Sequence, residues 1–330
     1  MPRRARVLIP AARPQIRIAS LYAKRKAHLM EIGFVGLGKM GMNMVERLRR
    51  DNHQIVAFDL DDAKRKEVST FGADGVGSLK DLVARLKPPR GVWVMVPAGD
   101  PTESTINQLA ELLEPGDAII DGGNTNFHDD VRRAAMLAAK KLHLVDAGTS
   151  GGIWGLKLGY CLMIGGEVEI FRRYEPIFQT LAPADGYDHV GGHGAGHYVK
   201  MVHNGIEYGL MQAYAEGFEA MHKSDYKLDL TKIAKLWRQG SVVRSWLLEL
   251  TANALEKDPG LKQIRGYVED SGEGRWAVQD AIDKNISMPV ITMALFTRFR
   301  SRADKGGGTF GEKLLAALRD EFGGHGVVKE

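Results

Sequence analysis

The feature of the sequence that most restricts the possible folds is a glycine-rich turn between an apolar run and a helical stretch. The apolar run covers residues 32–35, the turn reads Gly36-Leu-Gly38-Lys-Met-Gly41, and residues 42–50 carry apolar side chains at helical spacing. In a strand–turn–helix unit, the first glycine permits the tight turn and the second lets a pyrophosphate approach the backbone. The third lets the helix pack closely on the strand, and the helix N-terminus attracts the anion. The predicted dinucleotide contacts are Gly36, Leu37, Gly38, Lys39, Met40 and Gly41.

The identity of the dinucleotide depends on the end of the second expected strand, residues 54–58. That strand leads into Asp59, about 20 residues beyond the glycine turn, where a carboxylate bonds the ribose 2′-hydroxyl of NAD and repels the 2′-phosphate of NADP. Basic residues at 64–66 partly offset this negative charge. The balance predicts that NAD is preferred and that NADP is possible.

Further short apolar runs alternate with helical stretches up to residue 190. These runs lie at 91–96, 117–120, 143–146, 162–164 and 186–190. The alternation predicts a Rossmann-type α/β fold, in which a parallel sheet is doubly wound with helices on both faces. From Gly194 onward the pattern changes to long helices. The expected organisation is a basic extension at 1–29, a dinucleotide-binding domain at 30–192, and an all-helical substrate and dimerisation domain with a C-terminal tail at 193–330.

The loops that follow the expected strands are rich in small and polar residues. Ligands of such sheets bind at the carboxyl ends of the strands. There the chain has Pro97-Ala-Gly, Asp121-Gly-Gly-Asn124 and Ala147-Gly-Thr-Ser150-Gly-Gly152. Their hydroxyls and free backbone N–H groups suit a carboxylate held beside the nicotinamide, although loops of this composition also serve as plain turns. Cofactor contacts are expected from Val96, Pro97 and Asn124.

A polar stripe runs along the first helix of the second expected domain. Lys200, His203, Asn204 and Glu207 fall at i, i+3, i+4 and i+7, which places an amine, an imidazole, an amide and a carboxylate on one face. Tyr208 flanks that face. A solvated surface with an ordinary Lys–Glu pair is the alternative interpretation. The histidine and the asparagine favour an active-site face.

Composition and charge exclude several classes of protein. Of the 330 residues, 44% are hydrophobic and 26% are charged, which suits a globular protein of two domains. The net charge of +4 depends on the basic residues of the segment 1–29, so the remainder is mildly acidic and gives no case for nucleic acid. That segment fits a targeting sequence or, better, a start codon assigned too early, because strand-forming sequence begins at Met30.

The number of cysteines and the hydropathy of the chain indicate the cellular compartment in which we expect the protein. The single cysteine, Cys161, rules out an internal disulfide, and no Cys/His cluster has zinc-ligand spacing. No apolar run approaches the roughly 20 residues that span a membrane. We therefore expect a cytoplasmic protein without a metal ion or a membrane partner.

Four motifs of this chain occur together in one known family. They are the glycine turn, Asp121-Gly-Gly-Asn124, Ser150-Gly-Gly and Lys200-x-x-His-Asn-x-x-Glu207-Tyr. From Met30 to the C-terminus the chain resembles the decarboxylating 6-phosphogluconate dehydrogenases, a family of the β-hydroxyacid dehydrogenase superfamily, in their short-chain form. The resemblance implies a Rossmann domain followed by an all-helical domain. It also implies oxidative decarboxylation of 6-phospho-D-gluconate to D-ribulose 5-phosphate and CO2 with reduction of NAD or NADP, in the pentose phosphate pathway or in gluconate utilisation.

The resemblance assigns roles to individual residues. Lys200 is expected to be the general base and Glu207 the general acid. The arginine of Phe296-Thr-Arg298 is expected to bind the substrate phosphate. Arg319 and His325 are expected in the active site of the neighbouring subunit, in a homodimer or homotetramer with shared active sites. The full set of expected substrate contacts is Asn124, Ser150, Gly151, Gly152, His203, Asn204, Tyr208, Arg298, Arg319 and His325.

Two departures from the family pattern bear on substrate and cofactor. Ser271 stands where the family often has a lysine, so one phosphate contact is lost or moved. The chain reads Asp59-Leu-Asp61 where the common NADP-binding form carries Asn-Arg-Thr, which agrees with the preference for NAD.

Two other functions share part of these motifs. A 3-hydroxyacid dehydrogenase of the same superfamily, acting on a small unphosphorylated acid, would need the glycine turn, Ser150-Gly-Gly and Lys200. It would not need His203, Glu207 as a proton donor, or arginines for a phosphate. An inert dinucleotide-binding protein would need neither acid–base group.

Overall fold

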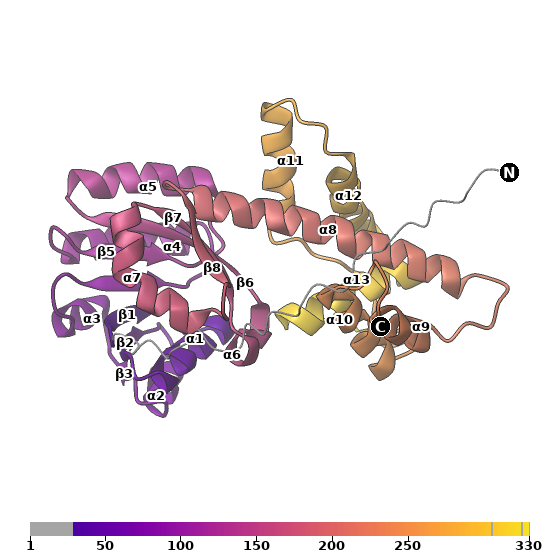
Figure 1. Ribbon diagram of the computed structural model, residues 1–330, viewed down its shortest axis with the longest axis horizontal. Coiled ribbons are helices and arrows are strands. Elements are labelled where there is room, and N and C mark those ends of the chain that lie inside the picture. The colour runs from indigo at the N-terminus through magenta and orange to yellow at the C-terminus, as the bar shows by residue number, and fades with distance from the viewer. Residues whose placement is uncertain (1–28, 305, 325, 330) are drawn as a thin grey trace, which may run out of the picture.

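The computed structural model describes residues 29–304, 306–324 and 326–329. The expected extension at 1–29 therefore lies outside the described residues, apart from Leu29. Figure 1 shows two lobes, one a sheet flanked by helices and the other a group of helices, with the long helix α8 (Ala195–His222) running from one to the other. The fold is the expected Rossmann-type domain followed by a helical domain. No helix of the described residues is long and apolar enough to cross a membrane.

The first lobe is built on an eight-stranded sheet with the order β3-β2-β1-β4-β5-β6-β7-β8. Its strands are β1 (Glu31–Val35), β2 (Gln54–Phe58), β3 (Asp74–Gly75), β4 (Gly91–Val94), β5 (Ala118–Asp121), β6 (His143–Ser150), β7 (Cys161–Gly166) and β8 (Tyr187–Gly191). The fold class is the predicted one, but the sheet is not parallel throughout, because β6 and β7 run antiparallel. Residues 151–160 between them hold only a 3₁₀ turn, η1 (Gly152–Trp154), and one helical turn, α6 (Gly155–Leu158). A parallel crossover needs a dozen or more residues, so this connection returns the chain as an antiparallel strand.

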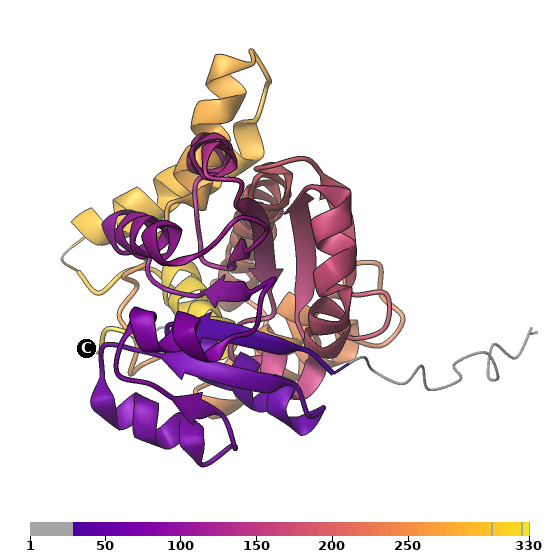
Figure 2. The ribbon, with the colours of Figure 1, turned by 90° about the vertical axis from the view of Figure 1, so that its left-hand side faces the viewer.

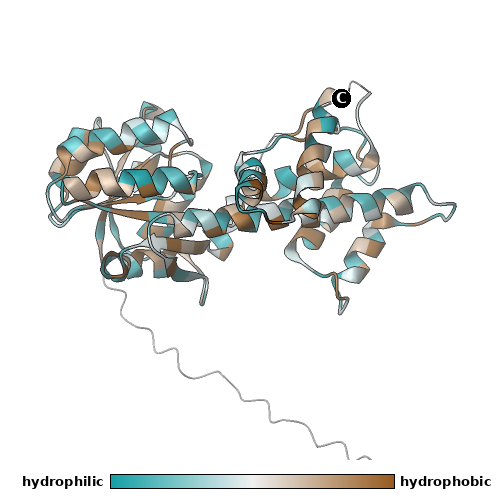
Figure 3. Cartoon of the chain, turned by 90° about the horizontal axis from the view of Figure 1, so that it is seen from above, coloured by the Kyte–Doolittle hydropathy of each residue, from teal (hydrophilic) through white to brown (hydrophobic). Residues whose placement is uncertain are grey.

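Helices cover both faces of the sheet (Figure 2). The residues of β4 show how the two hydrophobic cores divide: Trp93 faces one core, whereas Val92 and Val94 face the other, because successive side chains of a strand alternate. The first core includes residues of α1 (Lys39–Arg50), α2 (Asp62–Ser69) and α7 (Val168–Leu181). The second includes residues of α3 (Leu79–Arg85), α4 (Asp100–Leu112) and α5 (Phe127–Ala139). Figure 3 shows that the strands are largely hydrophobic, whereas the covering helices also carry hydrophilic residues.

The second lobe packs shorter helices around α8 (Figure 1). They are α9 (Leu230–Trp237), α10 (Trp246–Lys257), α11 (Glu273–Asp283), α12 (Pro289–Ala303) and α13 (Phe310–Gly323). Its core joins Phe218 of α8 to Leu248 of α10 and Leu314 of α13, all fully buried. Burial of such a side chain contributes about 1.5–3 kcal/mol, so this core fixes the lobe around α8.

A buried carboxylate and two glycines hold the start of α8 against the sheet. Asp146 accepts hydrogen bonds from the backbone N–H groups of Gly194 (2.8 Å) and His197 (3.1 Å), which a helix N-terminus otherwise leaves free. A β-carbon added at Gly148 of β6 would lie 2.6 Å from Cβ of Lys200 and 2.6 Å from the carbonyl oxygen of Gly196. The close approach that Gly148 permits places Lys200 at the carboxyl end of β6.

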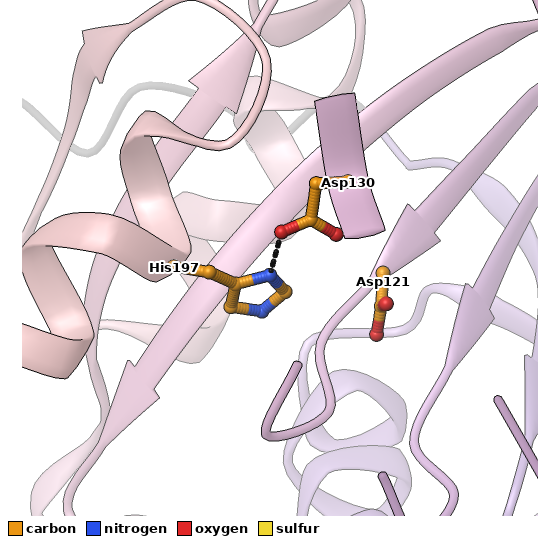
Figure 4. A group of neighbouring side chains, drawn as sticks. All are labelled: Asp121, Asp130 and His197. Atoms are coloured by element: carbon orange, nitrogen blue, oxygen red, sulfur yellow. Dashed lines mark hydrogen bonds and ion pairs between the residues drawn. The ribbon is translucent and has the colours of Figure 1, made fainter. Parts of the chain in front are cut away.

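A buried ion pair between His197 and Asp130 lies at the start of α8, with Asp121 nearby (Figure 4). Nδ1 of His197 lies 2.7 Å from Oδ2 of Asp130, and both side chains are buried. Burial lowers the pKa of His197, but the carboxylates of Asp130, Asp121 and Asp146 raise it to about 9, while burial raises the pKa of Asp130 to about 7. Possible metal-ligand atoms of Asp121, Asp130 and His197 lie within 4.8 Å of one another, but the ring already gives its Nδ1 proton to Asp130. The pair therefore ties α8 to α5.

Candidate active site

The polar stripe of α8 faces the space between the two lobes. Lys200, Asn204 and Glu207 line a cavity of about 310 Å³. His203 and Glu207 line an adjoining, more apolar cavity of about 480 Å³. The helical spacing therefore brings the four predicted side chains together at a site that can hold a ligand.

A chain of hydrogen bonds connects Lys200, Asn204 and His203 of the stripe. Nζ of Lys200 donates to Oδ1 of Asn204 at 2.5 Å, and Nδ1 of His203 lies 2.9 Å from the same oxygen. Because an amide oxygen only accepts, Nδ1 of His203 carries the proton and Nε2 is the acceptor in the neutral ring. That Nε2 lies 3.3 Å from Oγ of Ser150, which can donate to it. The chain thus runs from the helix to the loop after β6.

Segments far apart in sequence complete the walls of the 310 Å³ cavity. Most of the residues predicted to bind substrate contribute to it, together with Met40 of the glycine turn. The lining residues are Met40, Met95, Gly122, Gly123, Asn124, Thr149, Ser150, Gly151, Gly152, Lys200, Asn204, Glu207, Tyr208, Ser271, Glu273, Arg298, Arg319, Phe322 and Gly323. Of the predicted set, His203 lies in the adjoining cavity and His325 lies outside the described residues.

Burial shifts the pKa values of the two candidate acid–base groups in useful directions. It lowers the pKa of Lys200, an effect that the carboxylates of Glu273 and Glu207 oppose. It raises the pKa of Glu207, an effect that the charges of Lys200, His203 and Arg298 oppose. A lysine that loses its proton more readily and a carboxyl that keeps its proton longer are suited to act as base and acid near neutral pH.

Two arginines, Arg298 and Arg319, line the 310 Å³ cavity. Arg298 stacks over the ring of Tyr208, with its guanidinium carbon 3.3 Å from the ring centroid, and its Nη1 donates to the carbonyl oxygen of Glu269 at 3.2 Å. Burial lowers the pKa of Arg298 to about 10, and the nearby charge of Arg319 adds to this shift. Among the described residues, the guanidinium of Arg319 has no hydrogen-bonding partner. Two neighbouring buried guanidinium groups form a site for a dianion such as a phosphate.

Ser271 contributes through its backbone rather than through a cationic side chain. Its N–H donates to the hydroxyl of Tyr208 at 3.3 Å, and its carbonyl oxygen accepts from Nδ2 of Asn124 at 3.1 Å. The residue therefore ties the loop after β5 to the second lobe. It does not replace the charge of the family lysine.

The C-terminal helix lies beside α8 of its own chain, which differs from the expectation that Arg319 serves a neighbouring subunit. Arg319 lines the same cavity as Lys200 of the same chain. Just beyond it, Nζ of Lys39 donates to the carbonyl oxygen of Gly324 at 2.8 Å, and Nε1 of Trp154 donates to that of Glu321 at 2.8 Å. These contacts across the cleft hold the end of α13 at this chain's own site.

Each of the three glycines of the turn is required or permitted by a different feature of the local geometry. Gly36 has φ +97°, and a β-carbon there would lie 2.3 Å from the carbonyl oxygen of Met95. A β-carbon at Gly41 would lie 2.1 Å from the carbonyl oxygen of Gly36, so this position keeps α1 close to β1. Gly38 has open space around it, as a backbone approached by a pyrophosphate requires.

Asp59 lies beside the glycine turn and supports its backbone. Its Oδ2 accepts from the N–H of Leu37 at 2.7 Å, and its Oδ1 accepts from the N–H of Asp61 at 2.9 Å. Lys64 lies 3.8 Å from Oδ2. The carboxylate is partly exposed, so it can still meet a ribose hydroxyl.

The predicted cofactor contacts Val96 and Pro97 follow β4 next to the turn. A β-carbon at Gly36 would lie 3.0 Å from Cγ1 of Val96. Pro97 is exposed, and its carbonyl oxygen accepts from Oγ1 of Thr102 at 2.8 Å. Val96 thus lies beside the glycine turn, and the contact of both residues with the dinucleotide stays a prediction.

Glu273 is a cavity residue that the sequence motifs do not single out. It is 4% exposed, and its Oε1 accepts from Nδ2 of Asn204 at 2.5 Å. The only available signal is its position between two glycines, two residues after Ser271. Nothing in that pattern indicates a contact with a helix 69 residues earlier.

A Rossmann-type domain, a helical second domain and a lysine–carboxylate pair between them define a dinucleotide-dependent dehydrogenase of two domains. Residues 31–191 match the NAD binding domain of 6-phosphogluconate dehydrogenase, and residues 196–307 match the 6-phosphogluconate dehydrogenase C-terminal domain. The chain belongs to the 6-phosphogluconate dehydrogenase family.

Individual relatives agree with this assignment. The chain is 44% identical to a putative 6-phosphogluconate dehydrogenase of Bacillus subtilis, across 91% of this chain and 100% of that protein. It is 43% identical to the NAD(+)-dependent, decarboxylating 6-phosphogluconate dehydrogenase of Haloferax volcanii, across 91% of this chain and 99% of that protein. The solved 6-phosphogluconate dehydrogenase of Plasmodium falciparum is similar with a TM-score of 0.76 and 26% identity, covering 88% of this chain and 70% of the other.

Proposed function

We propose that this protein catalyses the oxidative decarboxylation of 6-phospho-D-gluconate to D-ribulose 5-phosphate and CO2, with NAD as the preferred hydride acceptor and NADP as a possible one. The observation that carries the proposal is one cavity that combines Lys200, Glu207 and the arginine pair beside the glycine turn. Relatives whose names state this activity, similar along their whole length, support it.

The residues of the turn fit NAD. The open space at Gly38 admits a pyrophosphate, and the start of α1 supplies N–H groups for it. Asp59 is suited to bond the ribose hydroxyls, while Lys64 and Arg65 leave some tolerance for a 2′-phosphate. Bound NAD supplies the hydride acceptor.

In the oxidation step, neutral Lys200 takes the proton of the C3 hydroxyl as C3 loses its hydride. The lowered pKa makes the neutral amine available. The hydrogen bond to Asn204 fixes the direction of the amine. The product is a 3-keto acid, whose carbonyl lies β to the carboxylate.

In the decarboxylation step, the bond between C1 and C2 breaks and its electrons flow to the oxygen on C3. Protonated Lys200 gives its proton to that oxygen, so CO2 leaves and an enediol forms. Glu207 then protonates the former C2, which becomes C1 of ribulose 5-phosphate, as Lys200 takes back the hydroxyl proton. The raised pKa of Glu207 keeps the proton available for this transfer.

The arginine pair favours a phosphorylated substrate over a small unphosphorylated acid. Buried Arg298 and Arg319 carry two positive charges that a small acid would leave without a counter-ion. We expect turnover of 6-phosphogluconate with equal amounts of NADH and CO2, and little turnover of small 3-hydroxy acids. NADH without CO2 from a small acid would favour the 3-hydroxyacid dehydrogenase instead, and no turnover of either would favour the inert protein.

We further propose a cytoplasmic homodimer or homotetramer, with domains at 30–192 and 193–330. Exposed apolar side chains on α8 and α10, namely Val199, Ile206, Leu210 and Trp246, support association of subunits. The arrangement of α13 supports active sites completed within one chain. The substrate and product suggest a role in the pentose phosphate pathway or in gluconate utilisation. Sedimentation of the purified protein tests the oligomeric state.

A further inference from the structure

Glu273 is pressed against the stripe of α8 by the packing of α11. It is the first residue of that helix, between Gly272 and Gly274. A β-carbon at Gly274 would lie 2.5 Å from the ring of Tyr208, so only glycine lets α11 begin this close to α8. The consequence is a carboxylate that is almost fully buried, with Oε1 on Asn204 and Oε2 without a partner among the described residues.

The contact with Glu273 decides which way the amide of Asn204 faces. An ionised carboxylate only accepts hydrogen bonds, so it selects the NH2 end of the amide. The oxygen end must then point to Lys200 and His203, both of which donate to it. With the amide reversed, its NH2 group would face the amine of Lys200, and two donors would oppose each other.

We propose that Glu273 is a positioning residue, which orients Asn204 so that Asn204 in turn aligns Lys200 and His203 for proton transfer. The inference rests on the proposed function, since it explains how the base of that reaction is held. It adds a residue that contacts neither of the reacting groups directly. Proton transfer is sensitive to such alignment, because a displacement of about 1 Å can cost a factor of about 10² in rate.

The carboxylate also acts on Lys200 through its charge. The titratable groups that act on Lys200 are Glu273 on α11, Glu207 on α8 and Cys161 on β7, while His203 on α8 and Arg298 on α12 act on Glu207. Of these, Glu273 is the first of the charges that raise the pKa of Lys200 against the effect of burial. Removing its charge therefore lowers that pKa further.

Three variants separate the two effects. Glu273→Gln keeps the shape of the side chain but removes its charge. The new amide can also turn either its oxygen or its NH2 group toward Asn204. We expect kcat to fall on the order of 10- to 100-fold, KM for 6-phosphogluconate and NAD to change little, and the acidic limb of the pH profile to move to lower pH. Glu273→Asp keeps the charge but shortens the side chain, so kcat should fall while the acidic limb stays in place. Glu216→Gln, an exposed carboxylate on α8, is the matched control and should leave both unchanged.

A double-mutant cycle with Asn204→Ala tests whether Glu273 acts through that residue. Once Asn204 is removed, Glu273→Gln should cause little further loss of kcat. The proposal would be overturned if Glu273→Gln left kcat unchanged or changed only KM. It would also be overturned if Glu273→Gln lowered kcat as much in the Asn204→Ala background as in the wild type.

Competitive acetylation of Lys200, followed by mass spectrometry across pH, needs no substrate. It should show a lower pKa in Glu273→Gln than in the wild type, and an unchanged pKa would contradict the coupling. A wild type that fails to convert 6-phosphogluconate would instead contradict the proposed function, while the acetylation result still decides whether Glu273 acts on Lys200.

Discussion

Nζ of Lys200 lies 2.5 Å from Oδ1 of Asn204, one turn further along α8. This contact holds the amine at the cavity wall, where burial lowers its pKa. One turn beyond Asn204, Glu207 lies in a setting that raises its own pKa. A single helix thus presents a base and an acid to the same ligand.

The pH dependence of kcat/KM should be bell-shaped. Lys200 must be neutral to accept a proton, so activity falls as pH drops through its pKa, which lies below that of an ordinary lysine. Glu207 must be protonated to donate, so activity falls as pH rises through its raised pKa. Profiles of the wild type and Glu207→Gln check this, because the variant should lose the alkaline limb. An alkaline limb that persists in the variant would assign it to another group.

Asp59→Ala should change the choice of cofactor. The substitution removes the charge that repels a 2′-phosphate, so kcat/KM with NADP should rise. It also removes the acceptor for the N–H of Leu37. Hydrogen bonds to charged groups contribute about 1.5–3 kcal/mol, so kcat/KM with NAD should fall roughly tenfold or more. A wild type that already uses NADP better than NAD would show that Asp59 does not select the cofactor.

Arg298→Lys should raise KM for 6-phosphogluconate without affecting the binding of NAD. A lysine keeps the charge but loses the planar group that stacks on Tyr208 and the fork that bonds two phosphate oxygens. The expected rise is roughly 10- to 100-fold, from about 1.5–3 kcal/mol of charge-assisted bonding. Arg300→Lys is the control on the same helix, because Arg300 is exposed and pairs with Glu312. Equal effects of the two substitutions would remove Arg298 from the phosphate site.

Mixing two inactive proteins tests which subunit receives the tail. With Arg319 in the site of its own chain, a hybrid of Lys200→Met and Arg319→Ala subunits carries one lesion in each site. Activity should therefore stay low after subunits have exchanged. Recovery of activity, with exchange proven by mass spectrometry, would mean that the tail crosses to the neighbour.

Local patterns predicted the parts of the site that depend on a single element. The spacing of Lys200 and Glu207 places them on one helical face whatever the surroundings, and the glycine turn is required by the backbone at Gly36. The positions of the other strands followed from short apolar runs in the same way, except for β3 (Asp74–Gly75), which has no such run and was not expected. In each case the signal lies within about one strand or one helix of sequence.

Features that depend on packing between elements did not show in the sequence. The antiparallel direction of β7 depends on β6 running on to Ser150, which leaves only residues 151–160 for the connection. The apolar runs expected at 143–146 and 162–164 left a longer connection, which did not exclude a crossover. The contact of Glu273 with Asn204 and the place of Arg319 depend on how α11 and α13 pack against α8. Such packing depends on the whole core of the helical lobe, so it cannot be predicted from the spacing of residues within one helix.

The most direct test measures NADH and CO2 formed from 6-phosphogluconate by the wild type, Lys200→Met and Glu207→Gln. Because Lys200 serves both steps, Lys200→Met should form neither product at a measurable rate. Glu207→Gln should retain much of the oxidation, seen as NADH in a single turnover, while protonation at C1 of the sugar product becomes slow. The wild type should form NADH and CO2 in equal amounts. Near-normal formation of both products by Lys200→Met would contradict the assignment of Lys200 as the base.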